Sequence, residues 1–184
     1  MITLSSFLSE WTGRGVNLPE DKNPYGFQCV ELVNEWLKEL GLNPEPFTNA
    51  QDFDDHYKLY DPTTLVYIPN TPLNVPKTGD IVIWQGTGLP FGHVAIFVHG
   101  DVNTFTSFDQ NWPSGSLPHL QSHTYWNVEG WLHPLMLDPV IDPKDTLIAQ
   151  LQGQLAAQTA EVAVLQGRIT DALAKIAAIR NLVQ

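Results

Sequence analysis

One thiol and a small set of polar side chains supply the groups needed for nucleophilic chemistry. Cys29 is the only cysteine of the chain, and it follows a turn-forming run at 24–28 and begins a segment with helical periodicity. The free backbone N–H groups and the positive dipole end at a helix N-terminus favour a thiolate over a thiol. The placement of Cys29 therefore predicts a reactive nucleophile, and such a nucleophile needs a base with an orienting partner.

His93 is the candidate base. It follows Gly92 and begins the otherwise apolar run 94–98, where a polar side chain has no packing role, whereas the other five histidines lack such a setting. An imidazole suits a thiol because its pKa lies near neutral pH. The chain is therefore predicted to be a cysteine hydrolase.

Asp109 and Asn111 are the candidate orienting groups. They follow the next strand-like run and stand two positions apart, so on a strand they would share one face. Either side chain could accept the N–H of His93 and fix its tautomer, and Trp112 could shield that hydrogen bond from water. Gln28 could stabilise an oxyanion through its side-chain amide, together with the backbone N–H of Cys29.

Composition excludes several classes of protein. The 184 residues are 43% hydrophobic, enough for one compact domain with an appendage, and the net charge of −11 argues against nucleic acid or an anionic membrane as a partner. A single cysteine forms no intrachain disulfide. The N-terminus lacks the basic region and the long apolar core of a signal peptide, and no segment is apolar enough to span a membrane.

The elements predicted around these residues are helices followed by strands. Helical periodicity covers 3–12 and 29–40, with a short helix at 50–57, and Gly41 is a natural stop. Runs of β-branched, aromatic and aliphatic residues predict strands at 65–68, 81–84, 93–98, 104–109 and 128–135. This order predicts an α+β domain with helices packed on an antiparallel sheet.

The C-terminal part has a different pattern. We predict a domain at 1–137, a Pro-containing linker at 138–146 and a long coiled-coil helix at 147–184, where apolar residues recur at alternating spacings of three and four. This pattern favours a homo-oligomer through the helix. The alternative is one long helix docked on its own domain or serving as a spacer.

Four blocks of sequence resemble the CHAP domain family (cysteine, histidine-dependent amidohydrolase/peptidase) in their order and spacing. They are Tyr-Gly-Phe-Gln-Cys-Val-Glu-Leu-Val at 25–33, Gly-Asp-Ile-Val-Ile-Trp at 79–84, Gly-His-Val-Ala-Ile-Phe at 92–97 and Phe-Asp-Gln-Asn-Trp at 108–112. The resemblance covers roughly 4–135. It implies a papain-like α+β fold and cleavage of bacterial peptidoglycan, as an N-acetylmuramoyl-L-alanine amidase or as an endopeptidase.

The same resemblance assigns roles to individual residues. Cys29 matches the nucleophile and His93 the base, while Asp109 and Asn111 occupy the block of the third member. Some phage members of the family also bind calcium near the nucleophile, which implies a structural calcium site at Asp21, Asn23 and Glu31; a solvated acidic turn is the alternative. No cofactor is expected for the chemistry itself.

The resemblance also predicts where such a protein acts. A phage endolysin without a signal peptide would stay in the host cytoplasm until it reaches the cell wall through a holin pore. Two alternatives fit less well. The NlpC/P60 peptidases usually show Asp-Cys-Ser-Gly around the nucleophile, which is absent here, and a non-catalytic wall-binding or phage tail structural protein would not need Cys29 and its partners. A metal site built on Cys29 lacks the CxxC or HExxH spacing.

Overall fold

The computed structural model describes residues 2–18, 25–42, 49–56, 63–86 and 88–138, and, towards the C-terminus, 151, 154–155, 158–170, 173 and 175–176. The chain divides into two compact units, Met1–Asp138 and Pro139–Gln184. Within the described ranges, no helix combines the length and the hydropathy that a membrane span requires.

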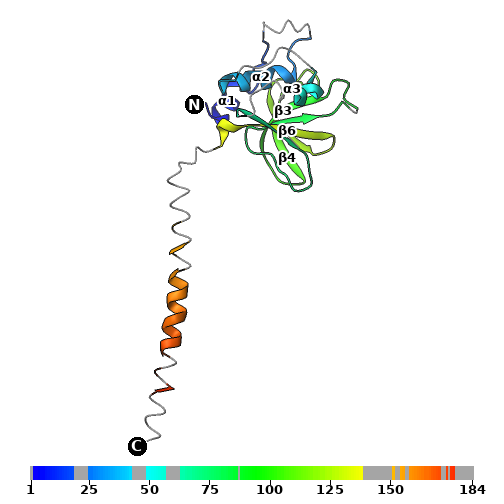
Figure 1. Cartoon of the computed structure of the whole chain (residues 1–184). Coiled ribbons are helices and arrows are strands. Elements are labelled where there is room, and N and C mark those ends of the chain that lie inside the picture. Colours follow the sequence, from blue (N-terminus) through cyan, green and yellow to red (C-terminus); the bar gives the residue numbers. More distant parts are fainter. Residues whose placement is uncertain are drawn as a thin grey trace, which may run out of the picture. The chain divides into compact units, whose positions relative to one another are not determined.

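The first unit contains helices and then strands, in the order that the sequence predicts (Figure 1). The helices are α1 (Leu4–Trp11), α2 (Cys29–Glu39) and α3 (Phe53–His56), with short 3-10 turns η2 (Ala50–Asp52) and η3 (Leu135–Leu137). The strands are β1 (Leu65–Pro69), β2 (Ile81–Trp84), β3 (His93–Gly100), β4 (Thr104–Asp109), β5 (His119–Thr124) and β6 (Val128–Pro134).

The strands form one antiparallel sheet in the order β1-β6-β2-β3-β4-β5, which confirms the predicted α+β class. Both faces of the central strands are buried, because side chains alternate between them along each strand. In β2, Ile81 and Ile83 join the larger core under α1 and α2, whereas Val82 and Trp84 join a smaller aromatic cluster on the opposite face.

Helix α2 covers the first face of the sheet. Its apolar stripe of Leu32, Val33, Trp36 and Leu37 is fully buried with Phe7 of α1 and Phe108 of β4. Thr3 caps α1, since its side chain accepts a hydrogen bond from the backbone N–H of Ser6. This packing fixes α2 over the sheet, so that its N-terminus has a defined position relative to the strand ends.

Strand β5 is the element that the sequence did not predict. Its residues alternate between half-buried and exposed, and polar side chains outnumber apolar ones in His-Leu-Gln-Ser-His-Thr. It is an edge strand paired only with β4. A strand with one neighbour and little core contact needs no apolar run, so the hydrophobic pattern gives no signal for it.

The described residues of the second unit are helical and exposed, and they include most of the apolar residues of the predicted heptad. Leu155, Val162, Leu165, Ile169 and Ile176 keep between 46% and 64% of their surface in solvent. The structure thus contains helix in this region. Pairing of this helix with a second copy stays a prediction of the heptad pattern.

Candidate active site

Cys29 occupies the first position of α2, as the sequence predicts, and it is nearly buried. Gln28 in front of it has an extended backbone, and the Glu31 carboxylate accepts the N–H of Gln28 at 2.7 Å. This pair fixes the first turn of the helix and therefore the direction of the Cys29 side chain. The thiol therefore belongs to the first turn of a helix and not to a loop.

His93 lies at the start of β3, directly opposite Trp84 of β2, and its ring is buried beside the thiol. Burial raises the pKa of Cys29, but the charge of His93, a hydrogen bond with its ring and hydrogen bonds from the Val94 and Val30 backbones outweigh it and lower the pKa below the usual range. Burial disfavours a charged His93, yet the Cys29 charge and the hydrogen bonds with Asp109 and Cys29 raise its pKa to about 9. The pair is therefore electrostatically suited to exist as thiolate and imidazolium.

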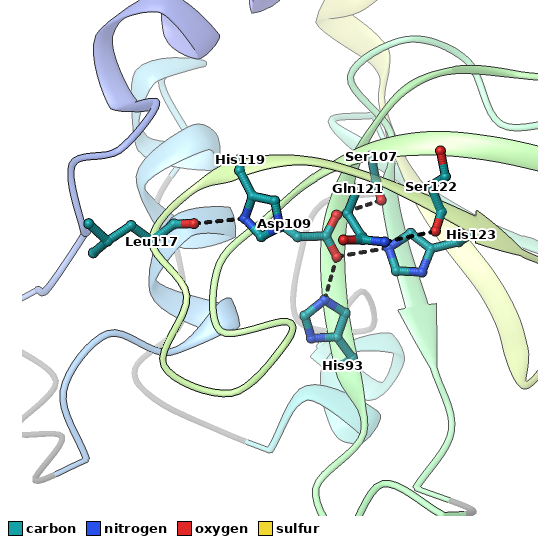
Figure 2. A network of polar contacts seen from close by, with 8 residues as sticks. All are labelled: His93, Ser107, Asp109, Leu117, His119, Gln121, Ser122 and His123. Carbon is teal, nitrogen blue, oxygen red and sulfur yellow. Dashed lines mark hydrogen bonds and ion pairs between the residues drawn. The ribbon is translucent and has the colours of Figure 1, made fainter.

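The structure brings Asp109 to His93. The His93 Nε2 atom lies 2.8 Å from Asp109 Oδ2, which leaves Nδ1 as the ring nitrogen for the thiol (Figure 2). Burial raises the pKa of Asp109, but hydrogen bonds from His123 and His93 and the charges of both rings lower it to about 2. An ionised Asp109 accepts only, so the Nε2–H tautomer of His93 is enforced.

Two tryptophans pack near the His93 ring. The His93 ring centroid lies 5.3 Å from Trp84 and 4.8 Å from Trp112, and the two indoles are 6.3 Å apart and nearly parallel. The position of Trp112 is consistent with the predicted shielding role. The indoles lower the local polarity, which strengthens the electrostatic interaction between the imidazole and the carboxylate.

Among the described residues, Asn111 forms its side-chain hydrogen bonds with Gln28 and Gly115 and not with His93. Strand β4 ends at Asp109, and Asn111 has a positive φ of 64°, so the expected same-face relation between i and i+2 is broken after the strand. Its Nδ2 donates to Gln28 Oε1 at 3.1 Å, and its Oδ1 accepts from the Gly115 N–H at 2.6 Å. The hydrogen bonds with Gly115 and Gln28 are thus what position the Asn111 side chain.

The Gln28 side chain is held by its neighbours. Its Nε2 donates to the carbonyl oxygens of Tyr25 and Phe27, at 3.1 and 3.3 Å, while its Oε1 accepts from Asn111. An amide nitrogen has two hydrogens, and both have acceptors here. An oxyanion role for this amide would require one of these bonds to break.

Gln110 is a site residue that sequence reasoning missed. Its fully buried amide accepts from the Val16 N–H and donates to the Val16 and Gln28 carbonyl oxygens, at 2.8, 2.9 and 2.7 Å. The three residues after Phe108 thus each bond to a different part of the site. Asp109 contacts His93, Gln110 bonds to the backbone before Cys29, and Asn111 bonds to the Gln28 side chain. The only signal in the sequence was the position of Gln110 between two candidate residues.

His123 is the second missed residue, and it corrects the expectation that no other histidine has a comparable setting. Its Nε2 lies 3.0 Å from the same Oδ2 of Asp109 that contacts His93 (Figure 2). The prediction failed because His123 belongs to β5, the unpredicted strand. A further buried pair, His133 Nδ1 with Asp80 Oδ1 at 2.6 Å, joins β6 to the residue before β2, outside the groove that contains Cys29.

Gly92 has a backbone requirement that the sequence did not reveal. Its φ is +70°, and a Cβ there would lie 2.5 Å from the Trp84 carbonyl oxygen and 2.6 Å from the Gln51 nitrogen. Only glycine fits this close approach without strain. The turn directs the chain into β3 so that its first residue, His93, points toward Cys29.

An open groove of about 1030 Å³ leads to the thiol and the imidazole. Cys29 and His93 line it, together with Asn111 and Trp112 from the turn after β4. Exposed aromatic side chains lie along the same groove, among them Tyr25, 76% exposed, and Phe91, 67% exposed. The shape suits an extended substrate more than a small enclosed one.

The predicted calcium site is only partly within the described residues, since Asp21 and Asn23 lie outside them. Glu31 is fully buried, and its two oxygens accept the backbone N–H groups of Leu18 and Gln28 at 3.2 and 2.7 Å. Among the residues that the structure describes, no cluster of three acidic, histidine or cysteine side chains is suited to a metal ion. In this geometry Glu31 caps α2.

Cys29 at the start of α2 and His93 at the start of β3 line the groove, and the buried carboxylate of Asp109 at the end of β4 contacts the His93 ring. This is the arrangement of side chains that a cysteine nucleophile with a histidine base and an orienting carboxylate requires. The CHAP domain family model matches residues 19–111, just over half of the chain, and the chain belongs to this family.

Named relatives agree with this assignment. The chain is 28% identical to the endolysin PlyTW of Staphylococcus phage Twort over 66% of its own length, and 33% identical to the probable autolysin PH of Staphylococcus aureus over 48%. It spans only 28% and 18% of those two proteins. Among solved structures, the endolysin LysIME-EF1 matches with a TM-score of 0.57 and 29% identity, covering 73% of this chain and 65% of that one.

Proposed function

We propose that this protein hydrolyses an amide bond of bacterial peptidoglycan by a cysteine–histidine mechanism, as an endolysin-like enzyme. The observation that carries the proposal is the line Cys29, His93 and Asp109, which reaches the open groove at its Cys29 and His93 end. Membership of the CHAP family and the endolysin and autolysin names of its relatives support peptidoglycan as the substrate.

The first half of the reaction makes a thioester. The Cys29 thiolate attacks the amide carbonyl carbon, and the carbonyl oxygen becomes an oxyanion, which we assign to the backbone N–H of Cys29. When the C–N bond breaks, the imidazolium of His93 gives the proton on its Nδ1 to the leaving amine. The hydrogen bond to Asp109 keeps the ring in position throughout.

The second half releases the acyl product. Neutral His93 takes a proton from water at Nδ1, and the oxygen of that water attacks the thioester carbon. The C–S bond then breaks, and the thiolate and imidazolium pair is restored beside a carboxylic acid product. The resting pair needs no cofactor for either half.

The experiment that tests the proposal is clearance of purified Gram-positive cell walls, followed by turbidity. Wild-type protein is expected to clear them, and Cys29→Ala is expected to have no activity because no other thiol exists in the chain. Clearance by Cys29→Ala would refute the mechanism. The rate of Cys29 alkylation by iodoacetamide near pH 6 distinguishes the enzyme from the non-catalytic alternative. A thiol that does not react would favour a structural role for the protein.

The bond that is cut distinguishes amidase from endopeptidase. Mass spectrometry of digested peptidoglycan identifies the new amino terminus: alanine indicates an N-acetylmuramoyl-L-alanine amidase, and a crossbridge or later stem residue indicates an endopeptidase. The proposal covers both, because both are amide hydrolyses by the same three groups. The same proposal includes the location of the enzyme. It would be held in the host cytoplasm until release and would then act at the bacterial cell wall.

The C-terminal helix is proposed to make the enzyme multivalent. Two linked catalytic units on a polymeric substrate would stay bound longer through effective concentration. Sedimentation of the full chain against a chain ending at residue 143 tests this prediction. A monomeric full chain would reject it and favour the spacer alternative.

A further inference from the structure

Asp109 contacts more donors than a simple triad needs. His93 and His123 both approach Oδ2, at 2.8 and 3.0 Å, and the Ser107 hydroxyl donates to Oδ1 at 2.6 Å (Figure 2). The carboxylate is fully buried. Each of its two oxygens therefore has a protein donor, and its orientation is fixed from both sides.

The chemistry of the carboxylate determines the state of His123. An ionised carboxylate only accepts, so His123 must present a hydrogen on Nε2. His123 is four positions along β5 from His119, the residue paired with Asp109, and its side chain reaches back to the carboxylate. A histidine in this placement is a donor to Asp109 rather than a second base for Cys29.

The surroundings of His123 leave it little freedom. Its side chain is 6% exposed, and its ring centroid lies 5.0 Å from Trp84, 5.6 Å from Phe105 and 5.5 Å from Trp112. Three aromatic rings from β2, β4 and the following turn thus hold the imidazole in place, and Asp109 is its hydrogen-bond partner. The titratable side chains of His99 and Asp101 line the same pocket as His123. Rigid donors in a low-polarity environment contribute more than mobile ones.

We propose that His123 is a positioning residue of the active site, which holds Asp109 in the ionised form and orientation that His93 requires. This inference rests on the proposed function only for its effect on wall hydrolysis, since its effect on the Cys29 thiol can be measured without any substrate. Without the His123 donor, the Asp109 carboxylate loses one of the hydrogen bonds that favour its charge, and its hold on the His93 imidazolium weakens. The thiolate of Cys29 then forms at higher pH.

The experiment compares three variants of the full chain. His123→Phe keeps an aromatic ring among the three neighbours but removes the donor, whereas His123→Gln keeps an N–H near the position of Nε2. The control is His119→Leu, on the same strand, whose ring contacts the Leu117 carbonyl oxygen at 2.8 Å instead of Asp109. Alkylation of Cys29 by iodoacetamide is followed from pH 4 to 9, and wall clearance is measured in parallel.

For His123→Phe we expect alkylation at pH 6 to fall about tenfold and its pH midpoint to rise by about one unit, the effect of losing one hydrogen bond to a charged group. His123→Gln and His119→Leu should stay within about threefold of the wild type. An unchanged midpoint in a folded His123→Phe, with only a lower melting temperature, would overturn the proposal. If alkylation shifts in His123→Phe while the wild type itself does not clear walls, the proposed function fails and the positioning role stands.

A measurement on the wild type covers the case in which His123→Phe does not fold. Long-range ¹H–¹⁵N spectra of the imidazole rings report which nitrogen carries the proton. We expect a proton on Nε2 of His123 at neutral pH. A neutral ring protonated only on Nδ1 would refute donation to Asp109.

Discussion

Replacing Asp109 by Asn tests the assignment of the third member most directly. The full shift of the His93 pKa, from about 6.5 to about 9, corresponds to roughly 3 kcal/mol in favour of the imidazolium. The Cys29 charge is the largest favourable cause, and Asp109 contributes both a hydrogen bond and a charge. Losing one hydrogen bond to a charged group costs roughly 1.5 kcal/mol, which is about tenfold in the population of the ion pair.

Asp109→Asn also replaces one of the two acceptor oxygens of the carboxylate by an NH₂ group, which donates. The amide keeps one oxygen, but His93, His123 and Ser107 all present donors to this position. The mismatch would turn the His93 ring or its tautomer. We therefore expect alkylation of Cys29 at pH 6 to fall about tenfold and wall clearance to fall about 100-fold or more, because the second measurement includes the loss of orientation.

The matched control is Asn111→Ala. Asn111 donates to Gln28 and has no bond to His93 in the described geometry, so both rates are expected to stay within about threefold of the wild type. Iodoacetamide kinetics across pH and initial rates of turbidity loss measure the two effects. A larger loss in Asn111→Ala than in Asp109→Asn would refute the assignment.

Three further perturbations test the supports of the site. Glu31→Gln should lower the free energy of unfolding by about 2 kcal/mol, because the carboxylate accepts two backbone N–H groups. The loss should be the same with and without EDTA, since these bonds need no ion. A loss that vanishes in EDTA would instead assign Glu31 to calcium. The pKa of Asp109 is lowered to about 2 in the folded protein, so the ionised carboxylate stabilises the fold by roughly 2 kcal/mol. This contribution is complete above about pH 4 and is lost as the pH falls toward 2. The urea midpoints of wild type and Asp109→Asn should therefore converge between about pH 4 and about pH 2. Gly92→Ala should cost more than about 2 kcal/mol by urea unfolding and reduce wall clearance, whereas Gly13→Ala, with φ +73° and open space, should cost about 1 kcal/mol; equal costs would contradict the steric argument.

The sequence by itself determined the class of fold and pointed to Cys29 and His93 as the candidate reacting pair. Apolar periodicity located α1, α2 and the five strands with buried side chains, since burial imposes a regular pattern on the residues. Cys29 could be identified because a helix start is a local feature, and His93 because a polar residue at the start of an apolar strand stands out. Both signals lie within a few residues of the side chain that they identify.

Only the tertiary structure decided how the base is held. Asp109 and Asn111 look equivalent in sequence, but the strand ends between them, and the backbone turns one toward His93 and the other toward Gln28. His123 and Gln110 act on residues 14 and 82 positions away, at Asp109 and Gln28. Contacts between distant segments depend on strand register and on the packing of side chains, and no local pattern of residues records either.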